Sequence, residues 1–226
     1  LLMARSEDKL AELSRQLPGT SDAFILDVGS AESVERAFRE ALARHGRIDV
    51  LVNNAGYGMF QWVQDMELAD FERMMNVNYM GVVRCTKAVL PSMLSAGSGH
   101  IVNVASLAGK IATAKSAGYS ASKHAVIGFT NSLRQELAGK GIRVTAINPG
   151  PVDTPFFDIA DPSGGYVSRI RALMLKPEQV ARSIVRAVEA GRPEADLPKI
   201  ASLGVKLFHL FPRTFARAGR RFLNFK

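Results

Sequence analysis

Short apolar runs alternate with helix-like segments along most of the chain. The runs that fit buried parallel strands are 23–28, 48–52, 100–105 and 142–147. The segments with helical patterning are 68–94, 119–138 and 179–190, and Ser30 is placed to cap a further helix. Strands that alternate with helices form a parallel sheet covered on both faces. We therefore expect an α/β fold with a doubly wound parallel sheet in one domain, residues 1–198, and ligands at the carboxyl ends of its strands.

The first ten residues have the pattern of a strand end followed directly by a helix. A doubly wound nucleotide-binding sheet needs one more strand before these, with a glycine-rich turn that holds a pyrophosphate. No such turn occurs in the 226 residues. Either this first strand and turn lie outside the sequence, or the cofactor site is incomplete. We favour the first alternative, because a sheet without its central strand leaves two buried edges unpaired.

Composition and charge argue against several classes of protein, namely membrane-spanning, secreted and nucleic-acid-binding proteins. The 226 residues are 47% hydrophobic, which is enough for one well-packed core, and no apolar run is long enough to span a membrane. We find no secretory signal, and the single cysteine, Cys85, fits a helix core in a reducing, cytoplasmic setting. Seven of the 29 basic residues, and no acid, lie in 199–226. Because this basicity belongs to a tail rather than to a domain face, we expect no nucleic-acid partner.

The tail, residues 199–226, is predicted to be a basic amphipathic helix. Phe215, Ala218, Phe222 and Phe225 fall near one helical face, while Arg213, Arg217 and Arg220 share another. The preceding segment, Gly204 to Phe211, is strongly apolar. Such a helix can lie on an anionic membrane surface, or it can dock on the domain or on an oligomer partner. The sequence leaves both alternatives open.

Tyr119 and Lys123 are the main candidates for acid–base chemistry. They are four residues apart, so a helix places both side chains on one face. A tyrosine pKa near 10 is too high for a base at neutral pH, and a fixed cation beside the phenol favours the phenolate. Ser106 follows a predicted strand, where its hydroxyl can hydrogen-bond a substrate oxygen. The spacing alone is weak evidence, but its position among several strand ends strengthens it.

The sequence resembles the classical short-chain dehydrogenase/reductase family over residues 1 to about 190. The matching pieces are Asp27-Val28, NNAG at 53–56, Asn78 in NVNYMG, Ser106, YSASK at 119–123 and PGPVDT at 149–154. The family's glycine-rich turn has no counterpart in the sequence. The resemblance implies a Rossmann-like fold and an enzyme that interconverts a carbonyl and an alcohol.

The resemblance also implies a role for each matching residue. Tyr119 would be the general acid or base, and Lys123 would hold the nicotinamide ribose and lower the tyrosine pKa. Ser106 would orient the substrate carbonyl, and Asn78 would anchor a water in a proton relay. The other implied cofactor contacts are Asp27 and Val28 at the adenine, Asn53, Asn54, Ala55 and Gly56 at the adenosine side, and Pro149, Gly150, Val152 and Thr154 at the nicotinamide amide.

Cofactor choice is predicted from Arg5. An acidic residue at the end of the second strand selects NAD, whereas this sequence has Ala4 and Arg5 there. An arginine suits a 2′-phosphate, so we expect NADP(H), with NAD(H) as the alternative. None of the four histidines has metal-ligand spacing with a cysteine or carboxylate, and we expect no metal.

Residues 155–175 mix aromatic and apolar side chains with turn formers. They fit an apolar lid over a lipophilic substrate, or a lid that packs only on its own domain. The family resemblance further implies a homodimer or homotetramer formed through the long helices at 68–94 and 119–138. The main hypothesis is an NADP(H)-dependent reductase, and the alternative is a nicotinamide-sensing binding protein without turnover.

Overall fold

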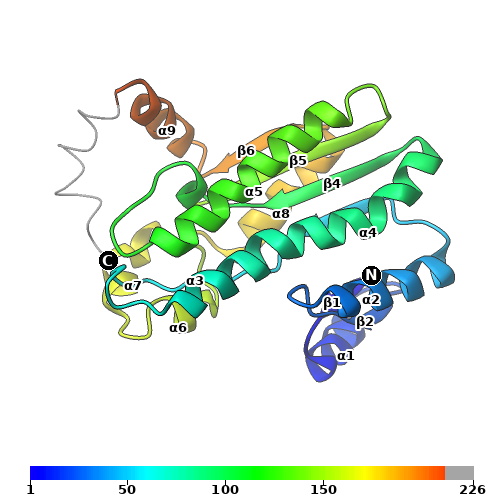
Figure 1. Ribbon diagram of the computed structural model, residues 1–226, viewed down its shortest axis with the longest axis horizontal. Coiled ribbons are helices and arrows are strands. Elements are labelled where there is room, and N and C mark those ends of the chain that lie inside the picture. The colour runs from blue at the N-terminus through cyan, green and yellow to red at the C-terminus, as the bar shows by residue number, and fades with distance from the viewer. Residues whose placement is uncertain (212–226) are drawn as a thin grey trace.

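The computed structural model describes residues 1–211 (Figure 1). The strands are β1 (Leu2–Ala4), β2 (Ala23–Ile25), β3 (Val50–Asn53), β4 (Gly99–Val104), β5 (Ile142–Pro149) and β6 (Glu194–Leu197). The longer helices are α1 (Glu7–Gln16), α2 (Ala31–His45), α3 (Leu68–Met75), α4 (Gly81–Ala96), α5 (Ala117–Glu136), α8 (Pro177–Glu189) and α9 (Ala201–Leu210). The short helical turns are η1 (Asn76–Met80), η2 (Leu107–Gly109), α6 (Phe156–Ala160), α7 (Gly165–Ile170) and η3 (Arg171–Leu173).

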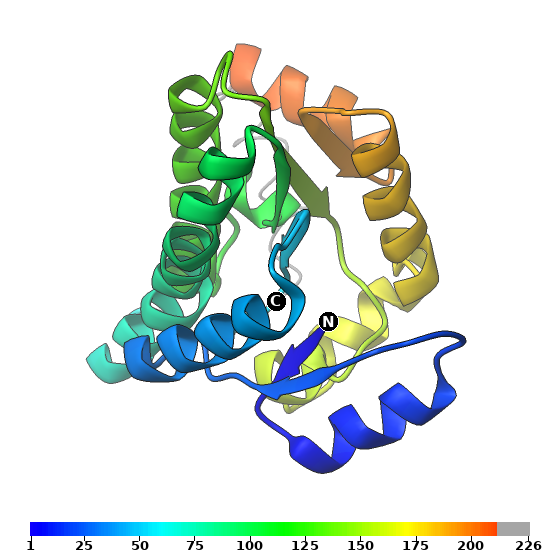
Figure 2. The same cartoon turned by 90° about the vertical axis from the view of Figure 1, so that its right-hand side faces the viewer.

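All strand pairs are parallel, as the alternating pattern predicts. β3, β4, β5 and β6 form one sheet in that order, and β1 pairs with β2. The long helices α4 and α5 cover one face of the larger sheet and α8 covers the other (Figures 1 and 2). Ser30 caps α2, where its hydroxyl accepts a hydrogen bond from Ser33 N at 3.2 Å. The predicted Rossmann-like α/β architecture is confirmed.

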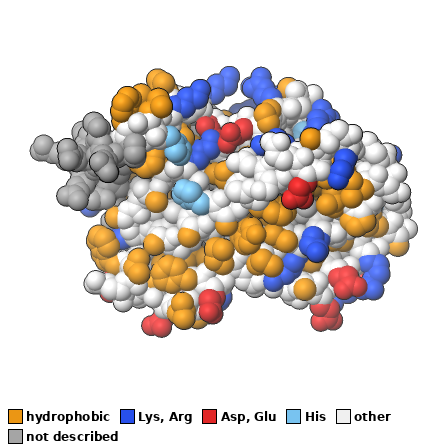
Figure 3. All heavy atoms as spheres, turned by 45° about the horizontal axis from the view of Figure 1, so that its top comes forward, with side chains coloured by type: hydrophobic (Ala, Val, Ile, Leu, Met, Phe, Trp, Pro, Cys, Tyr) orange, Lys and Arg blue, Asp and Glu red, His pale blue; other side chains and the backbone are white. Residues whose placement is uncertain are grey.

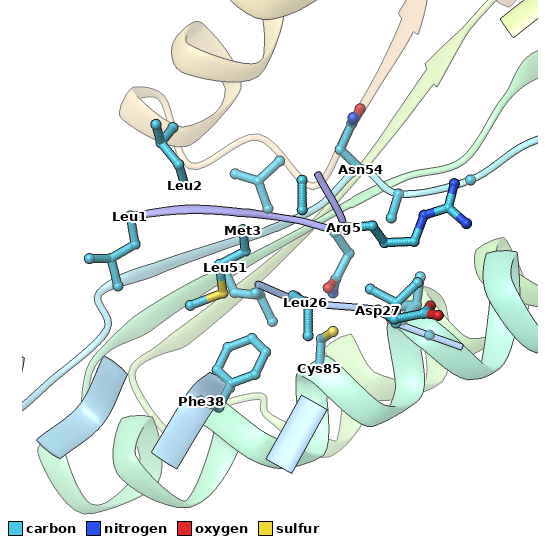
Figure 4. Close-up of a pocket in the computed structure, with 18 of the residues that line it drawn as sticks. Leu1, Leu2, Met3, Arg5, Leu26, Asp27, Phe38, Leu51, Asn54 and Cys85 are labelled. Atoms are coloured by element: carbon cyan, nitrogen blue, oxygen red, sulfur yellow. The ribbon is translucent and has the colours of Figure 1, made fainter. Parts of the chain in front are cut away.

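The two sheets are separated at β1 and β3. No strand of residues 1–211 lies between them, and a cavity of about 1080 Å³ occupies the space. Figure 4 shows its apolar lining, which includes Leu26, Phe38, Leu51 and Cys85. The expected continuous sheet is therefore interrupted, because neither strand has a hydrogen-bonding neighbour on the side that faces the cavity.

Amide hydrogen exchange should report the open edge of β3. Alternate residues of a strand direct their backbone groups to opposite neighbours. Because Asp49 O accepts from His100 N of β4, Leu51 and Asn53 also face β4, while Val50 and Val52 face the cavity. Both valines are 42% exposed. We expect their amides to exchange at least about a hundredfold faster than those of Leu51 and Asn53, measured by NMR. Equal protection of all four would contradict the interrupted sheet.

The predicted helix at 68–94 is continuous in space but not uniform. It consists of α3, the π-helical turn η1 and α4. Cys85 of α4 is buried, and desolvation raises the pKa of its thiol to about 12. A thiol that stays protonated at neutral pH is a packing residue rather than a nucleophile. The expectation of a structural cysteine in a helix core is confirmed.

The C-terminal part contains elements that the apolar pattern did not predict. β6 is short and only partly buried, so it lacks the apolar run that marks the inner strands. Residues 155–175 fold into α6, α7 and η3 rather than an open loop. The apolar segment 204–211 lies in and after α9, whereas the predicted helix beyond Pro212 lies outside the described residues. Within residues 1–211 no helix is both long and apolar enough to cross a bilayer.

Candidate active site

Ser106 lies immediately beyond the carboxyl end of β4. Its backbone is extended and its side chain caps η2, accepting from Ala108 N at 3.1 Å. The same hydroxyl donates to Pro149 O at the end of β5, 3.3 Å away. Gly109 lets η2 approach α5 closely, since a Cβ there would lie 2.7 Å from Lys123 O. These contacts fix the serine at the junction of β4, β5 and α5.

Tyr119 and Lys123 occupy the first turns of α5, one turn apart. The ammonium of Lys123 lies 5.9 Å from the centroid of the Tyr119 ring and donates to Val104 O at 2.9 Å. Lys123 is buried, and this burial lowers the pKa of its ammonium to about 8. The structure therefore brings the two side chains together as their spacing predicts.

The phenol of Tyr119 is held in its protonated form. Desolvation raises its pKa to about 12, while a hydrogen bond with the Ser106 side chain acts in the lowering direction. The net direction is opposite to the lowering expected from Lys123 and an oxidised nicotinamide together. The physical reason is that, in the protein alone, the desolvation cost of forming the phenolate exceeds the stabilisation that neighbouring groups give it.

Asn78 is fully buried in the π-helical turn η1, and its amide makes three hydrogen bonds within the protein. Its Nδ2 donates to Tyr57 O at 2.8 Å and to Ser122 Oγ at 2.9 Å, and its Oδ1 accepts from Tyr57 N at 3.0 Å. The side chain therefore joins the segment after β3 to α5. The water relay expected at Asn78 stays a prediction, and these contacts hold its side chain in place.

The NNAG segment after β3 contributes residues to both the core and the crevice. The Asn53 side chain points into the core, donating to Asn103 Oδ1 at 2.9 Å and to Thr86 Oγ1 at 3.3 Å. Asn54 and Gly56 instead line the cavities, and Ala55 lies between them. A Cβ at Gly56 would come within 3.0 Å of Asn78 Oδ1 and 3.4 Å of Lys123 Nζ. Glycine keeps the backbone close to the lysine at this position.

The PGPVDT segment forms the opposite wall of the site. Pro149 ends β5, and the following Gly150 donates from its N–H to Leu197 O at 2.7 Å. Val152 pairs with Leu175 as an isolated bridge, and Thr154 Oγ1 accepts from Phe156 N at 3.4 Å. Pro149, Gly150, Val152 and Thr154 all line the cavity that contains Ser106 and Tyr119.

An aromatic cluster covers the candidate catalytic side chains. Phe156 lies 5.4 Å from Tyr119 between ring centroids, and Phe60 lies 5.4 Å from Tyr166. Phe60 N also donates to Ala160 O at 3.0 Å, which joins the segment after β3 to α6. Phe60, Phe156, Phe157 and Tyr166 all line the cavity of about 760 Å³ that contains Ser106, Tyr119 and Lys123. The lid therefore faces the site rather than only its own domain.

Phe60 was not among the sequence-based candidates. It lies seven residues after β3, and nothing in its neighbourhood has strand or helix periodicity. Its only sequence signal is that it follows the NNAG motif, in a segment rich in glycine and aromatic residues. Its contact with a lid about a hundred residues later becomes visible only in the folded chain.

The adenosine-side candidates lie at the ends of β1 and β2. Arg5 follows β1, and Asp27 and Val28 follow β2. Asp27 Oδ1 accepts from Gly29 N at 2.8 Å, and Val28 O accepts from Arg84 Nη1 at 3.0 Å. Figure 4 shows Arg5 and Asp27 extending toward the same side of the larger cavity, where both are exposed. The sequence-predicted cofactor residues thus surround one crevice.

The two cavities meet at the NNAG segment. The cavities of about 1080 and 760 Å³ share Asn54 and Gly56 in their walls. Arg5 and Asp27 line the first, and Ser106, Tyr119 and Lys123 line the second, so an elongated ligand reaches both across the NNAG segment. This matches the rule that ligands bind outside the carboxyl ends of the strands. Residues 1–211 contain no glycine-rich turn here to which a pyrophosphate contact could be assigned.

The histidines have local structural contacts. His100 is buried and lies 2.7 Å from Thr145 Oγ1, and its pKa is lowered by burial. His45 pairs with Asp22, and the Nδ1 atoms of His124 and His209 lie at hydrogen-bonding distance from backbone carbonyls one turn earlier. In the described part of the chain, no three His, Cys, Asp or Glu side chains gather as a metal-ligand set.

Comparison with known proteins agrees with this geometry. Residues 1–162 match the family model of short chain dehydrogenases. An uncharacterised oxidoreductase of Staphylococcus saprophyticus is 37% identical, over 84% of this chain and 80% of that protein. A short-chain dehydrogenase from Streptomyces avermitilis superposes with a TM-score of 0.82 at 26% identity, covering 97% of this chain and 86% of that one.

A second solved structure bears on the cofactor. It is an alcohol dehydrogenase from the archaeon Thermococcus sibiricus complexed with 5-hydroxy-NADP, with a TM-score of 0.75 and 30% identity over 87% of this chain and 83% of that one. The ligand in that structure is a nicotinamide nucleotide. The chain therefore belongs to the short-chain dehydrogenase family, whose members are oxidoreductases that interconvert alcohols and carbonyl compounds with a nicotinamide cofactor.

Proposed function

We propose that this protein reduces a ketone or aldehyde group on a lipophilic small molecule, using NADPH, with Tyr119 as the general acid. The observation that carries the proposal is the cavity of about 760 Å³ in which Ser106, Tyr119 and Lys123 meet the aromatic lid. A nicotinamide bound in the crevice would supply the hydride. Tyr119 Oη then donates its proton to the carbonyl oxygen, and Ser106 Oγ hydrogen-bonds that oxygen as negative charge develops.

The raised pKa of Tyr119, about 12, keeps the phenol protonated at neutral pH and supports its role as the proton donor in reduction. A phenol that remains protonated is ready to give a proton, whereas alcohol oxidation needs the phenolate. In oxidation the proton would move the other way, and the rate would increase with pH until the phenol ionises. Lys123 places a positive charge beside the phenol, which stabilises the phenolate left after proton transfer.

The lipophilic substrate is inferred from the lid. Phe60, Phe156 and Phe157 present apolar rings to the cavity, and Val180 and Ile184 of α8 line its other side. Apolar side chains outnumber polar ones in the lining, where the polar ones are Asn54, Ser106, Thr113, Tyr119, Lys123, Thr154 and Tyr166. A substrate with one carbonyl and a bulky apolar body matches this distribution.

Phe60→Ala should separate bulky from small substrates. We expect its KM for a bulky aromatic ketone to rise about tenfold, because it loses apolar contact area at the lid. The KM for a small ketone such as acetone should change less than twofold, and this serves as the internal control. Steady-state NADPH consumption measures both. Equal losses for the two ketones would indicate general damage to the site and contradict a substrate-facing lid.

Arg5→Glu should reverse the preference for NADPH. Arg5 is exposed at the end of β1 and lines the crevice, where charge-assisted hydrogen bonds to a 2′-phosphate are worth about 1.5–3 kcal/mol. We expect kcat/KM for NADPH to fall by about 10–100-fold, while the value for NADH is unchanged or higher. Arg15→Glu, on the exposed end of α1, makes the same change in net charge and is the matched control. Parallel losses for both cofactors would refute NADPH selection by Arg5.

We also propose a cytoplasmic enzyme that assembles as a homodimer or homotetramer through α4 and α5. Support comes from the length of these helices, which lie side by side over one face of the sheet (Figure 1). The buried, protonated Cys85 requires no oxidising compartment.

A further inference from the structure

The outward face of α9 and the residue before and after it form an apolar stripe. Its members are Ile200, Leu203, Leu207, Leu210 and Phe211, which recur at helical spacing. All are exposed, with Ile200 at 79%, Leu210 at 70% and Leu203 at 61%. Figure 3 shows hydrophobic side chains gathered at the upper left of the molecule, over α9, with basic side chains beside them. An exposed stripe of this size on one helix marks a contact surface.

This stripe does not dock on the domain. α9 packs inward through Val205, its one buried residue, which lies on the opposite side of the helix from Leu203 and Leu207. The helix is also tethered at its start, because Ser202 Oγ donates to Asp196 at 3.0 Å and Ala201 N donates to Pro198 O at 2.9 Å. The inward face and the tether fix the orientation of α9. The apolar stripe is therefore directed away from the core.

The charges around the stripe identify its partner. Lys199 and Lys206 are exposed and lie along one border of it. The sequence from 199 to 226 carries seven basic residues and no acid. A second copy of the chain meeting this face would bring the lysines of two copies, Lys199 and Lys206 of each, close together. An anionic lipid surface instead attracts them, accepts the apolar side chains, and lets lysine stems extend along the boundary.

We propose that α9 and the basic residues around it dock on an anionic membrane surface, with the helix lying in the interface plane. The position of α9 links this contact to the catalytic cavity. It follows β6, whose Leu197 O receives the N–H of Gly150 in the wall of the catalytic cavity. Docking therefore places the cavity edge near the bilayer. The functional value of this placement rests on the proposed lipophilic substrate, whereas the docking itself does not.

Vesicle flotation of the full chain tests the docking without any enzyme assay. Vesicles of phosphatidylcholine alone and of phosphatidylcholine with about 30% phosphatidylserine are compared at about 0.1 M salt, where charges separated by roughly 10 Å still interact. We expect binding to the anionic vesicles only. The double variant Leu203→Glu/Leu207→Glu should bind at least about tenfold less, because it removes apolar insertion and adds negative charge while the other basic residues remain. Circular dichroism verifies that it is folded.

The matched control is Val185→Glu. Val185 is an exposed apolar residue of α8, 54% accessible, and the substitution adds one negative charge away from the stripe. Its binding should remain within about twofold of wild type. Undiminished binding by the α9 double variant, or equal binding to neutral and anionic vesicles, would overturn the proposal. So would a dimer that binds no vesicles and becomes monomeric in the double variant, since that result assigns the stripe to a second copy.

Discussion

Tyr119→Phe is expected to lower kcat for carbonyl reduction by about 10²–10⁴-fold, the usual contribution of a positioned general acid. Phenylalanine keeps the ring that packs against Phe156 at 5.4 Å and Phe60 at 6.2 Å, and it removes only the hydroxyl. The carbonyl oxygen then loses its proton donor, while Ser106 can still hydrogen-bond it. NADPH affinity should stay within about threefold, because the lid and the wall from Pro149 to Thr154 are untouched. Single-turnover kinetics and fluorescence titration of NADPH measure the two quantities.

Tyr79→Phe provides the matched control for this experiment. Tyr79 lies in η1, and its ring packs against Phe129 at 6.2 Å, outside the catalytic cavity. Removing its hydroxyl should change kcat less than twofold. A Tyr119→Phe enzyme that kept more than about a tenth of wild-type activity would reject Tyr119 as the proton donor. Tight NADPH binding by the wild type with no turnover on any of a broad panel of carbonyls and alcohols would favour the sensor hypothesis instead.

Lys123→Met is expected to remove activity without loss of stability. Burial lowers the pKa of Lys123 from 10.5 to about 8, which corresponds to about 3 kcal/mol of cost for keeping the ammonium charged at neutral pH. Methionine removes that cost, but it leaves Val104 O without its 2.9 Å donor, a loss of about 1–3 kcal/mol. At pH 7 the variant should be as stable as wild type or up to about 2 kcal/mol more stable. Carbonyl reduction should fall at least about 10²-fold, because the charge beside the phenol is gone.

The pH dependence of stability separates the cost of the buried Lys123 charge from any change in packing. The folded-state pKa of Lys123 lies below its unfolded value, so between pH 8 and 10.5 the unfolded chain binds more protons than the folded one. The free energy of unfolding of the wild type should therefore gain a contribution that increases with pH across that window. Lys123→Met lacks this gain, and any advantage it has at pH 7 should disappear by about pH 10.5. Denaturant unfolding at several pH values measures the difference.

Lys9→Met is the control for removing a lysine. Lys9 lies on the exposed side of α1, away from the proposed α4–α5 interface, so its side chain stays hydrated in the folded state. Its stability curve should run parallel to that of wild type between pH 7 and 10.5. A Lys123→Met variant destabilised by more than about 1 kcal/mol at pH 7 would show that the buried ammonium stabilises the fold, contrary to our expectation.

Local patterns predicted the residues of the site better than their roles. The spacing of Tyr119 and Lys123 places both on one face of a helix, and Ser106 follows an apolar strand run, so their meeting point could be predicted from periodicity and topology. Asn78 and Asn53 were also identified as site residues. Their side chains, however, bond to Tyr57 and Ser122 and to Thr86 and Asn103. These partners are distant in sequence, and no local pattern specifies them.

The sequence by itself determined the alternating α/β architecture, the parallel direction of the strands and the segment that bears Tyr119 and Lys123. Helix and strand periods are local properties, and a strand end has only one edge of the sheet on which to present its residues. Tertiary structure alone decided the direction of the Tyr119 pKa, the contact of Phe60 with the lid and the outward orientation of α9. Desolvation, ring packing and surface exposure each depend on atoms from several distant segments, so they exist only once the chain has folded.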